Sequence, residues 1–223
     1  MASPPRTTRG RTPLTRERIL RAALAIIDER GLRALTMRGQ AAELGVEAMS
    51  LYWHVKGKPA VLDGVVEMLL DEMPVDRSPE LGWREGLEHF ARCFRRVALD
   101  HPDAFPLFAA RPIAAYIAGR DLAEVGLARL VEAGLPPVDA ALAQRSVIRW
   151  VLGFSLSEQA GRGELARAPQ LAAEAHLPED GYPLVTGALT AIAGDQEGAV
   201  LFEYGLRLVL DGIEVAISSR RQG

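Results

Sequence analysis

The chain has 223 residues, of which 48% are apolar and 25% are charged, and its formal net charge is −3. This length and composition predict one small and one medium-sized hydrophobic core. They exclude a disulfide framework, because Cys93 is the single cysteine, and a transmembrane protein, because no charge-free apolar run could span a bilayer. No signal peptide is recognisable, and a reducing cytoplasmic location is expected. Cys93 is then a small packed residue of a helix or, alternatively, a redox sensor.

Basic residues are concentrated at the beginning of the chain. Residues 1–60 hold eleven Lys or Arg and five Asp or Glu, whereas the remainder is acidic. Such asymmetry indicates a nucleic-acid-binding end joined to a body with another task. Residues 1–13 carry Arg6, Arg9 and Arg11 among small and turn-forming residues, which predicts an arm that is disordered when free. Such an arm follows a DNA groove or is a solvated tail, and the sequence favours neither.

The first helices fit a DNA-binding motif. A helix at about 15–30 precedes two short helices, at about 37–44 and 48–54, which Gly45 separates. Thr36 can cap the second helix through its hydroxyl, and Gly45 suits a left-handed turn that residues with a Cβ resist. Two short helices joined by such a turn are typical of a helix-turn-helix, whose second helix enters the major groove of double-stranded DNA.

The residues outside the core of this motif are suited to DNA. Four small or amphipathic residues of the third helix are expected to face outward: Ala48, Met49, Ser50 and Tyr52. Four residues that can bond phosphates follow: Trp53, His54, Lys56 and Lys58. Lys58 also begins the next helix, where free backbone N–H groups favour a phosphate. In the alternative, Trp53 or His54 packs against the first helix.

Helical periodicity continues along the rest of the chain. We expect further helices at about 58–73, 83–100, 113–133, 138–160, 183–193 and 196–217. Residues 74–82 are predicted to form a hinge, and Pro102, Pro106 and Pro112 to break the stretch after the helix at 83–100 into short pieces. Residues 161–182 have no steady period and are predicted to be a mobile loop. No segment shows sustained strand alternation, and the predicted fold class is therefore all-α.

Three runs of the sequence carry a family resemblance. They are Leu-Thr-Arg-Glu-Arg-Ile-Leu-Arg-Ala-Ala-Leu at 14–24, Leu-Thr-Met-Arg at 35–38 and Leu-Tyr-Trp-His-Val at 51–55. Through them, residues 14–73 resemble the DNA-binding domain of the tetracycline-repressor family of bacterial transcription regulators, and a weaker similarity continues past residue 80. The resemblance implies four parts: an arm at 1–13, a DNA-binding domain at 14–60, a connecting helix at 61–73, and an effector-binding and dimerisation domain at 74–223.

The resemblance also implies which residues contact or position DNA. They are Thr36, Arg38, Ala48, Met49, Ser50, Tyr52, Trp53, His54 and Lys58. Arg38 would read guanine, because arginine suits the O6/N7 edge of that base. Ala48 and Met49 replace a glutamine and a proline of the tetracycline-binding member, and alanine cannot make the bidentate bond to adenine. We therefore expect an operator that differs from the operator of that member.

A small-molecule pocket in the second domain is a further implication. The candidates for lining it are aromatic and polar residues of the matching segments: Phe90, Phe94, Phe105, Phe108, Arg111, Tyr116, Trp150, Phe154 and Ser157. Alternatively, any single aromatic residue among them belongs to the hydrophobic core.

The tetracycline-binding member of the family holds a drug–magnesium chelate through histidine, asparagine, phenylalanine and glutamate side chains. At the matching positions this chain has Pro74, Phe90, Phe94, Leu107 or Phe108, and Ser157. Only the phenylalanine is retained, and Phe or Leu side chains cannot coordinate Mg²⁺. We therefore expect no metal and no cofactor, and an apolar or aromatic effector in place of the tetracycline chelate.

A homodimer is predicted through the helices at about 138–160 and 196–217. Gly198, Gly205 and Gly212 recur at seven-residue intervals, and each glycine inside a helix costs about 1 kcal/mol relative to alanine. A close neighbour on that face would explain them, and two such helices from each subunit can build a four-helix interface. In the alternative, the glycines pack closely against another helix of the same subunit.

The predicted function is a DNA-binding transcription regulator, and a repressor by family resemblance. A two-fold dimer would place two recognition helices about 34 Å apart on a palindromic operator. Effector binding near Arg111 and Pro112 would then shift the helix at 58–73 and change that separation. No enzyme is expected, because the four histidines and one cysteine form no catalytic motif. No membrane partner is expected either, because no apolar run could span a bilayer. The alternative is a DNA-binding regulator or scaffold without an effector.

Overall fold

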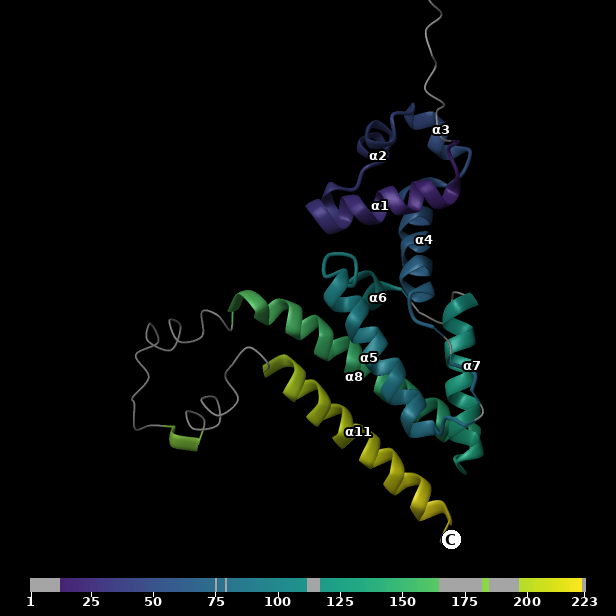
Figure 1. Cartoon of the computed structure of the whole chain (residues 1–223), viewed down its shortest axis with the longest axis vertical. Helices are drawn as coiled ribbons and strands as arrows, with labels where there is room; N and C mark the ends of the chain where they lie inside the picture. Colours follow the sequence, from purple (N-terminus) through teal and green to yellow (C-terminus); the bar gives the residue numbers. More distant parts are fainter. Residues whose placement is uncertain are drawn as a thin grey trace, which may run out of the picture. The chain divides into compact units, whose positions relative to one another are not determined.

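The computed structural model describes residues 13–74, 76–78, 80–111, 117–164, 182–184 and 197–221 (Figure 1). Helices make up most of these residues and none of them lies in a strand, so the all-α prediction is confirmed. The chain divides into two compact units, Met1–Met68 and Leu69–Gly223. The predicted arm falls almost wholly outside the described residues. Within the described ranges, no helix is both long and apolar enough to cross a membrane.

The first unit contains α1 (Arg16–Arg30), the 3-10 helix η1 (Leu32–Ala34), α2 (Met37–Leu44), α3 (Ala48–Tyr52) and the first part of α4 (Gly57–Asp71). α1 begins where the Thr15 hydroxyl accepts a hydrogen bond from the Arg18 backbone N–H at 3.2 Å. It ends at Gly31, whose φ of 81° favours glycine. Apolar side chains at three- and four-residue spacings bury one face of α1 against its neighbours, and its buried residues are Ile19, Leu20, Ala23, Leu24, Ile26 and Ile27.

Two details of the first unit were not indicated by the sequence pattern. In α2, Ala42 is exposed, whereas Gln40 is fully buried. Gln40 Nε2 donates to the Ile19 carbonyl at 2.7 Å, and this bond makes burial of the polar side chain tolerable. α3 ends at Tyr52, two residues before its predicted end, because Trp53 and the next residue form a turn.

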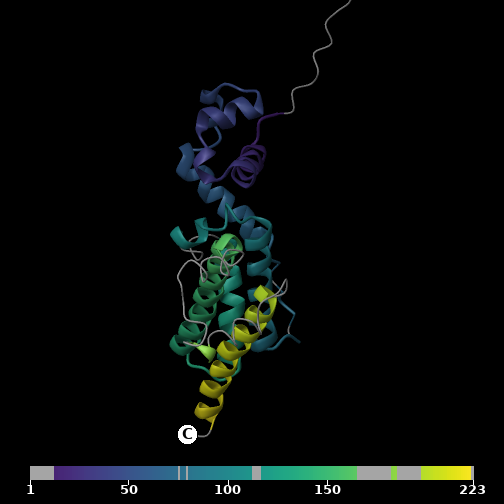
Figure 2. The ribbon, with the colours of Figure 1, turned by 90° about the vertical axis from the view of Figure 1, so that its left-hand side faces the viewer.

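The second unit contains the end of α4, α5 (Trp83–Asp100), α6 (Leu107–Ala110), α7 (Ile117–Glu132), α8 (Pro137–Glu164) and α11 (Glu197–Arg221). α5 packs along α8, and α7 and α11 each contact both of these helices. The two ribbon views place α7 and α11 on opposite sides of the α5–α8 pair (Figures 1 and 2). α8 therefore has one face toward α7 and another toward α11.

Two helices of the second unit run further than predicted. α8 continues to Glu164, so residues 161–164 are helical and do not belong to the predicted loop. Glycines lower the stability of a helix but do not block it sterically as a proline would, so α8 can continue through residues 161–164. α11 continues to Arg221, and its Ser219 hydroxyl donates to the Val215 carbonyl at 2.8 Å, which satisfies a polar side chain within the helix. The rest of the predicted loop and most of the predicted helix at 183–193 lie outside the described residues.

Candidate functional site

Local hydrogen bonds hold the helix-turn-helix in shape. The Thr36 hydroxyl accepts from the Gly39 backbone N–H at 3.0 Å, which caps α2 as predicted. Gly45 has a φ of 66°, the predicted left-handed conformation, and its N–H donates to the Ala42 carbonyl at 3.1 Å. Leu51 anchors α3 because its side chain is fully buried. Met49 and Tyr52 of α3 are exposed, whereas Ala48 and Ser50 are half-buried.

Large side chains of α3 and of the turn after it are exposed. The exposed fraction is 69% for Met49, 48% for Tyr52 and 88% for Trp53, and His54 is exposed as well. The alternative in which Trp53 or His54 packs against α1 is therefore wrong. Adjacent exposed apolar and aromatic side chains are typical of a surface that a partner covers. This surface consists of the residues for which DNA contacts are predicted.

Two basic residues of the first unit for which DNA contacts are expected lack an acidic partner in the described part of the chain. Arg38 and Lys56 make no hydrogen bond or ion pair there. Three other arginines of the first unit are each paired with a glutamate, in the pairs Arg16–Glu67, Arg21–Glu17 and Arg30–Glu43. A cation without an acidic partner can bond a phosphate without first breaking an ion pair. The positive charge near α3 is thus available to a nucleic acid.

Lys58 has a structural contact that the sequence pattern did not indicate. Its Nζ donates to the Leu35 carbonyl at 2.6 Å, and the side chain is partly buried. The bond ties the start of α4 to the segment before α2. An ammonium group has three donors, so two remain for a phosphate. The predicted phosphate contact of Lys58 stays a prediction beside this structural role.

A cavity of about 570 Å³ lies within the second unit. This volume is typical of sites that hold small organic ligands. Its wall combines residues of α5, α6, α7 and α8 with residues that follow α4 and α6. Three predicted ligand-binding residues line it: Phe90, Phe108 and Arg111. Their contact with a ligand stays a prediction.

Sequence reasoning missed several polar and aromatic lining residues. They are Trp83, His89, Cys93, Arg129, Gln144, Arg145 and Arg149. Along α8 a detectable signal was present, because Ala141, Arg145, Ile148 and Leu152 follow a three- and four-residue spacing. That spacing defines one helical face, although it does not by itself say what the face lines.

Phe94 and Phe105 belong to the core, although they were predicted to line the pocket. Both are fully buried, and their ring centroids lie 5.0 Å apart. Phe108 completes the cluster, with its ring centroid 5.1 Å from that of Phe94. Phe108 therefore connects this core cluster with the cavity wall.

Trp150, Phe154 and Ser157 were also predicted to line the pocket, and the structure places them elsewhere. Trp150 and Phe154 contact Phe202 of α11, with ring centroids 5.4 Å and 5.3 Å from it. Two residues along a helix turn a side chain by about 200°, so Trp150 lies opposite the cavity-lining Ile148. Ser157 is exposed and does not line the cavity. Tyr116 lies outside the described residues.

Hydrogen bonds tie the cavity wall to the segment that leaves α4. Arg129 of α7 donates from Nη2 to the Asp76 carbonyl at 2.8 Å and to the Ser78 carbonyl at 3.2 Å. Gln144 of α8 is buried, and its Nε2 donates to the Ala123 carbonyl of α7 at 3.1 Å. The wall formed by α7 is thus bonded both to α8 and to the residues that follow α4.

Cys93 lies in the cavity wall and is partly buried. Burial raises the pKa of its thiol, and the nearby Arg96 opposes this effect more weakly. The thiol is therefore mostly protonated near neutral pH and is a weak nucleophile. This favours the interpretation of Cys93 as a packed residue over that of a redox sensor.

The glycines of α11 differ in their surroundings. A Cβ at Gly205 would lie 2.6 Å from Trp150 Cζ2, and one at Gly198 would collide with the Glu158 carboxylate. Both glycines therefore face α8 of the same chain, as the alternative interpretation expected. A Cβ at Gly212 would meet nothing within 4 Å among the described residues.

An apolar stripe of α11 faces away from its own chain. Leu201, Leu208 and Val215 recur at seven-residue intervals and are exposed, as is Leu142 of α8. Seven-residue spacing keeps such side chains near one face of a helix. These residues leave an apolar surface on the two helices that were predicted to dimerise.

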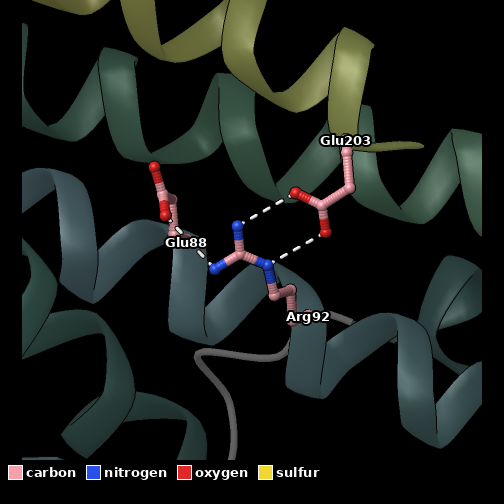
Figure 3. A network of polar contacts seen from close by, with 3 residues as sticks. All are labelled: Glu88, Arg92 and Glu203. Atoms are coloured by element: carbon pink, nitrogen blue, oxygen red, sulfur yellow. Dashed lines mark hydrogen bonds and ion pairs between the residues drawn. The ribbon is translucent and has the colours of Figure 1, made fainter. Parts of the chain in front are cut away.

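Arg92 links α5 with α11 (Figure 3). Its Nε and Nη2 donate to the two carboxylate oxygens of Glu203, at 3.0 Å and 2.9 Å, and its Nη1 donates to Glu88 at 3.2 Å. The hydrogen bond from Arg92 lowers the pKa of Glu203. This planar, two-bond pairing is an exposed contact between α5 and α11.

Three residues at positions matched to the metal site of the tetracycline-binding member line the cavity. Pro74, Phe90 and Phe108, at positions matched to the metal site of the tetracycline-binding member, line the cavity but offer no side-chain oxygen or nitrogen. Within the described part of the chain, no three His, Cys, Asp or Glu side chains gather as a metal site would require.

Two family models match the chain. Residues 19–65 match the model described as "Bacterial regulatory proteins, tetR family", and residues 76–217 match "Tetracyclin repressor-like, C-terminal domain". An HTH-type transcriptional regulator of Saccharopolyspora erythraea is 33% identical over 214 residues, which cover 94% of this chain and 89% of that protein. Tetracycline repressor protein class A from transposon 1721, of Escherichia coli, is 34% identical over 206 residues, which cover 91% of each chain.

A solved structure agrees with these matches over nearly the whole chain. The Streptomyces coelicolor TetR family protein ActR, in complex with actinorhodin, has a TM-score of 0.76 and is 29% identical. The match covers 92% of this chain and 99% of ActR.

Proposed function

Because this chain belongs to the tetR family of bacterial regulatory proteins, we propose that it is a repressor that a hydrophobic or aromatic effector releases from a palindromic operator. As a member of that family it is a DNA-binding regulator and not an enzyme. The observation that carries the proposal is the position of the cavity. Met73 and Pro74, which follow the end of α4 within three residues, form part of its wall. We place its action in the cytoplasm, where bacterial DNA is found.

The DNA contacts belong to the first unit. Exposed Met49 and Trp53, together with Arg38 and Lys56, which have no acidic partner in the described part, support a surface that docks on DNA. Arg38 reads a guanine, and the residues of the turn after α3 position the phosphates. Ala48 can touch a thymine methyl group but cannot form two hydrogen bonds with adenine.

The effector occupies the cavity of the second unit. Its mostly apolar wall and its volume of about 570 Å³ support an organic ligand of drug-like size. Pro74, Phe90 and Phe108 offer no metal ligand in that wall, which argues against a tetracycline–magnesium chelate. The similarity of the chain to tetracycline repressors thus concerns the scaffold and not the effector.

The coupling between ligand and DNA passes through α4. This helix begins in the first unit and ends in the second, and the residues after it line the cavity. Arg129 holds the same segment through the carbonyls of Asp76 and Ser78. A ligand that displaces Met73 or Pro74 therefore moves the end of α4, and the coupling free energy, typically about 1–3 kcal/mol, acts equally on effector and operator affinity.

Two copies of the chain act together. The exposed apolar residues Leu142, Leu201, Leu208 and Val215 support a homodimer through α8 and α11. A two-fold dimer presents two copies of α3 to successive major grooves, about 34 Å apart, which explains a palindromic operator.

Operator binding measured by fluorescence anisotropy tests the proposal. The labelled probe is the DNA flanking the gene of this protein, titrated with and without a panel of aromatic natural products and with tetracycline plus Mg²⁺. We expect tight, salt-dependent binding that an aromatic compound weakens and the tetracycline chelate does not. Arg38→Ala is the matched control for specific binding.

Two results would contradict the proposal. Release by tetracycline with Mg²⁺ would show that the chelate binds despite the replaced ligands. Operator binding that no compound disturbs, together with a melting temperature that no compound raises, would instead favour a DNA-binding regulator or scaffold without an effector.

A further inference from the structure

The cavity wall carries an excess of positive charge. Four arginines line it: Arg111, Arg129, Arg145 and Arg149. Asp76 is the one carboxylate among the described lining residues, and its Oδ1 accepts a hydrogen bond from the Ser78 backbone N–H at 2.8 Å. Four guanidinium groups and one carboxylate in a largely apolar wall give the cavity a positive potential. The occupant of the cavity must match this potential.

Two of these arginines are positioned to bind a ligand. Arg145 and Arg149 are four residues apart on α8 and therefore lie on the same helical face. Both line the cavity and are also exposed, which places them at its mouth. Neither makes a hydrogen bond or an ion pair within the described residues, whereas Arg129 already bonds two backbone carbonyls. Like charges at this spacing repel each other until an anion joins them.

The rest of the wall is suited to rings. Phe90 and Phe108 line the cavity together with apolar residues of α7 and α8 such as Leu122 and Ile148. A neutral apolar ligand would fill this part but would leave the two guanidinium groups without an anionic partner. A small inorganic anion would satisfy the arginines but leave the apolar part empty.

We propose that the effector is an aromatic organic anion, whose carboxylate or phenolate group pairs with Arg145 and Arg149 while its rings lie against Phe90 and Ile148. A planar guanidinium can donate two parallel hydrogen bonds to such a group. The proposal rests on the proposed function, in which the cavity is the effector site, and it defines the chemical class of the effector.

The test compares two fluorescent probes of the same shape on the full-length protein. Anilinonaphthalene sulfonate carries an anionic group that stands in for the carboxylate, and phenylnaphthylamine is its uncharged parent. We expect the sulfonate to bind at least about tenfold more tightly, since hydrogen bonds between charged groups have this magnitude. Arg145→Gln and Arg149→Gln should each remove most of this preference without changing the affinity of the uncharged probe.

Two control variants make the outcome decisive. Arg120→Gln removes the same charge from α7 at a residue that does not line the cavity, and it should leave both affinities unchanged. Ala141→Phe fills part of the cavity and should weaken both probes. Equal affinities for the two probes, together with unchanged sulfonate binding by the Gln variants, would contradict the proposal that the effector is an anion. The cavity would remain a candidate ligand site. Unchanged binding of both probes by Ala141→Phe would overturn this inference and the proposed effector site together.

Discussion

Arg95 of α5 donates two hydrogen bonds to Glu158 of α8, from Nε at 2.9 Å and from Nη2 at 2.6 Å. The two side chains are only 18% and 13% exposed. The guanidinium carbon of Arg95 also lies 4.9 Å from the centroid of the Phe202 ring of α11. A single ion pair therefore connects the three helices that form this side of the second unit.

Breaking this pair should destabilise the second unit. Arg95→Met leaves the Glu158 carboxylate poorly solvated and without its partner, and we expect a loss of about 2–3 kcal/mol in the free energy of unfolding. Urea denaturation followed by circular dichroism measures it. Arg220→Met is the control, because its pair with Asp139 is more exposed and should contribute at most about 1 kcal/mol. Equal losses in the two variants would contradict this distinction.

The glycines of α11 should respond differently to the same substitution. Gly205→Ala places a methyl group against the Trp150 ring and should destabilise the protein by about 1–3 kcal/mol. In Gly212→Ala the added methyl group has no neighbour within 4 Å in the same chain, and the higher helix propensity of alanine should raise the free energy of unfolding by up to about 1 kcal/mol. Thermal unfolding of the two variants tests the difference. If Gly212→Ala also weakens self-association in sedimentation experiments, the partner subunit approaches that glycine closely.

The Arg92–Glu203 pair should make stability depend on pH. The hydrogen bond from Arg92 lowers the pKa of Glu203 in the folded chain. A lowered pKa means that the stabilisation is present above the unfolded pKa of the carboxyl group and is lost as pH falls through the folded value. Both side chains are about half exposed, so the effect should stay below about 1 kcal/mol. Between neutral and acidic pH, the melting temperature of Glu203→Gln should fall less steeply than that of the wild type, and parallel curves would refute this role.

Arg38 and Lys58 should affect DNA binding in different ways. Arg38→Ala should relax the preference at one base pair, with a cost of about 1–3 kcal/mol on the specific operator. Lys58→Ala should weaken binding to all sequences alike and reduce the salt dependence. It should also destabilise the first unit by about 1 kcal/mol, because the bond to the Leu35 carbonyl is lost. Anisotropy titrations on operator and on scrambled DNA separate the two effects, and a uniform loss in both variants would disprove the distinction.

Cys93 should report on occupancy of the cavity. Because burial raises the pKa of its thiol, alkylation by iodoacetamide should be slower than that of a free cysteine near neutral pH and should accelerate as pH rises. A ligand in the cavity should slow the reaction further, since Cys93 lines the wall. Mass spectrometry of the alkylated protein measures both rates. Identical rates with and without a bound ligand would place that ligand elsewhere.

Local sequence patterns determined the helix-turn-helix and most helix boundaries. Thr36 and Gly45 adopt the predicted capping and turn conformations, and α5 has the predicted bounds, because these preferences depend on residues only a few positions apart. The same patterns singled out Met49 and Tyr52, which are exposed beside the buried Leu51, although Ala48 and Ser50, also expected to face outward, are half-buried.

Only the tertiary structure decided which aromatic residues meet a ligand cavity. Phe90 and Phe94 lie on the same helix one turn apart, yet one lines the cavity and the other is sealed in the core. An apolar side chain is equally compatible with a core, a cavity and an interface, and its neighbours from distant segments select among them. The same holds for Gly205 and Gly212, which share a sequence spacing but not a neighbour, because α8 approaches α11 closely at only one of them.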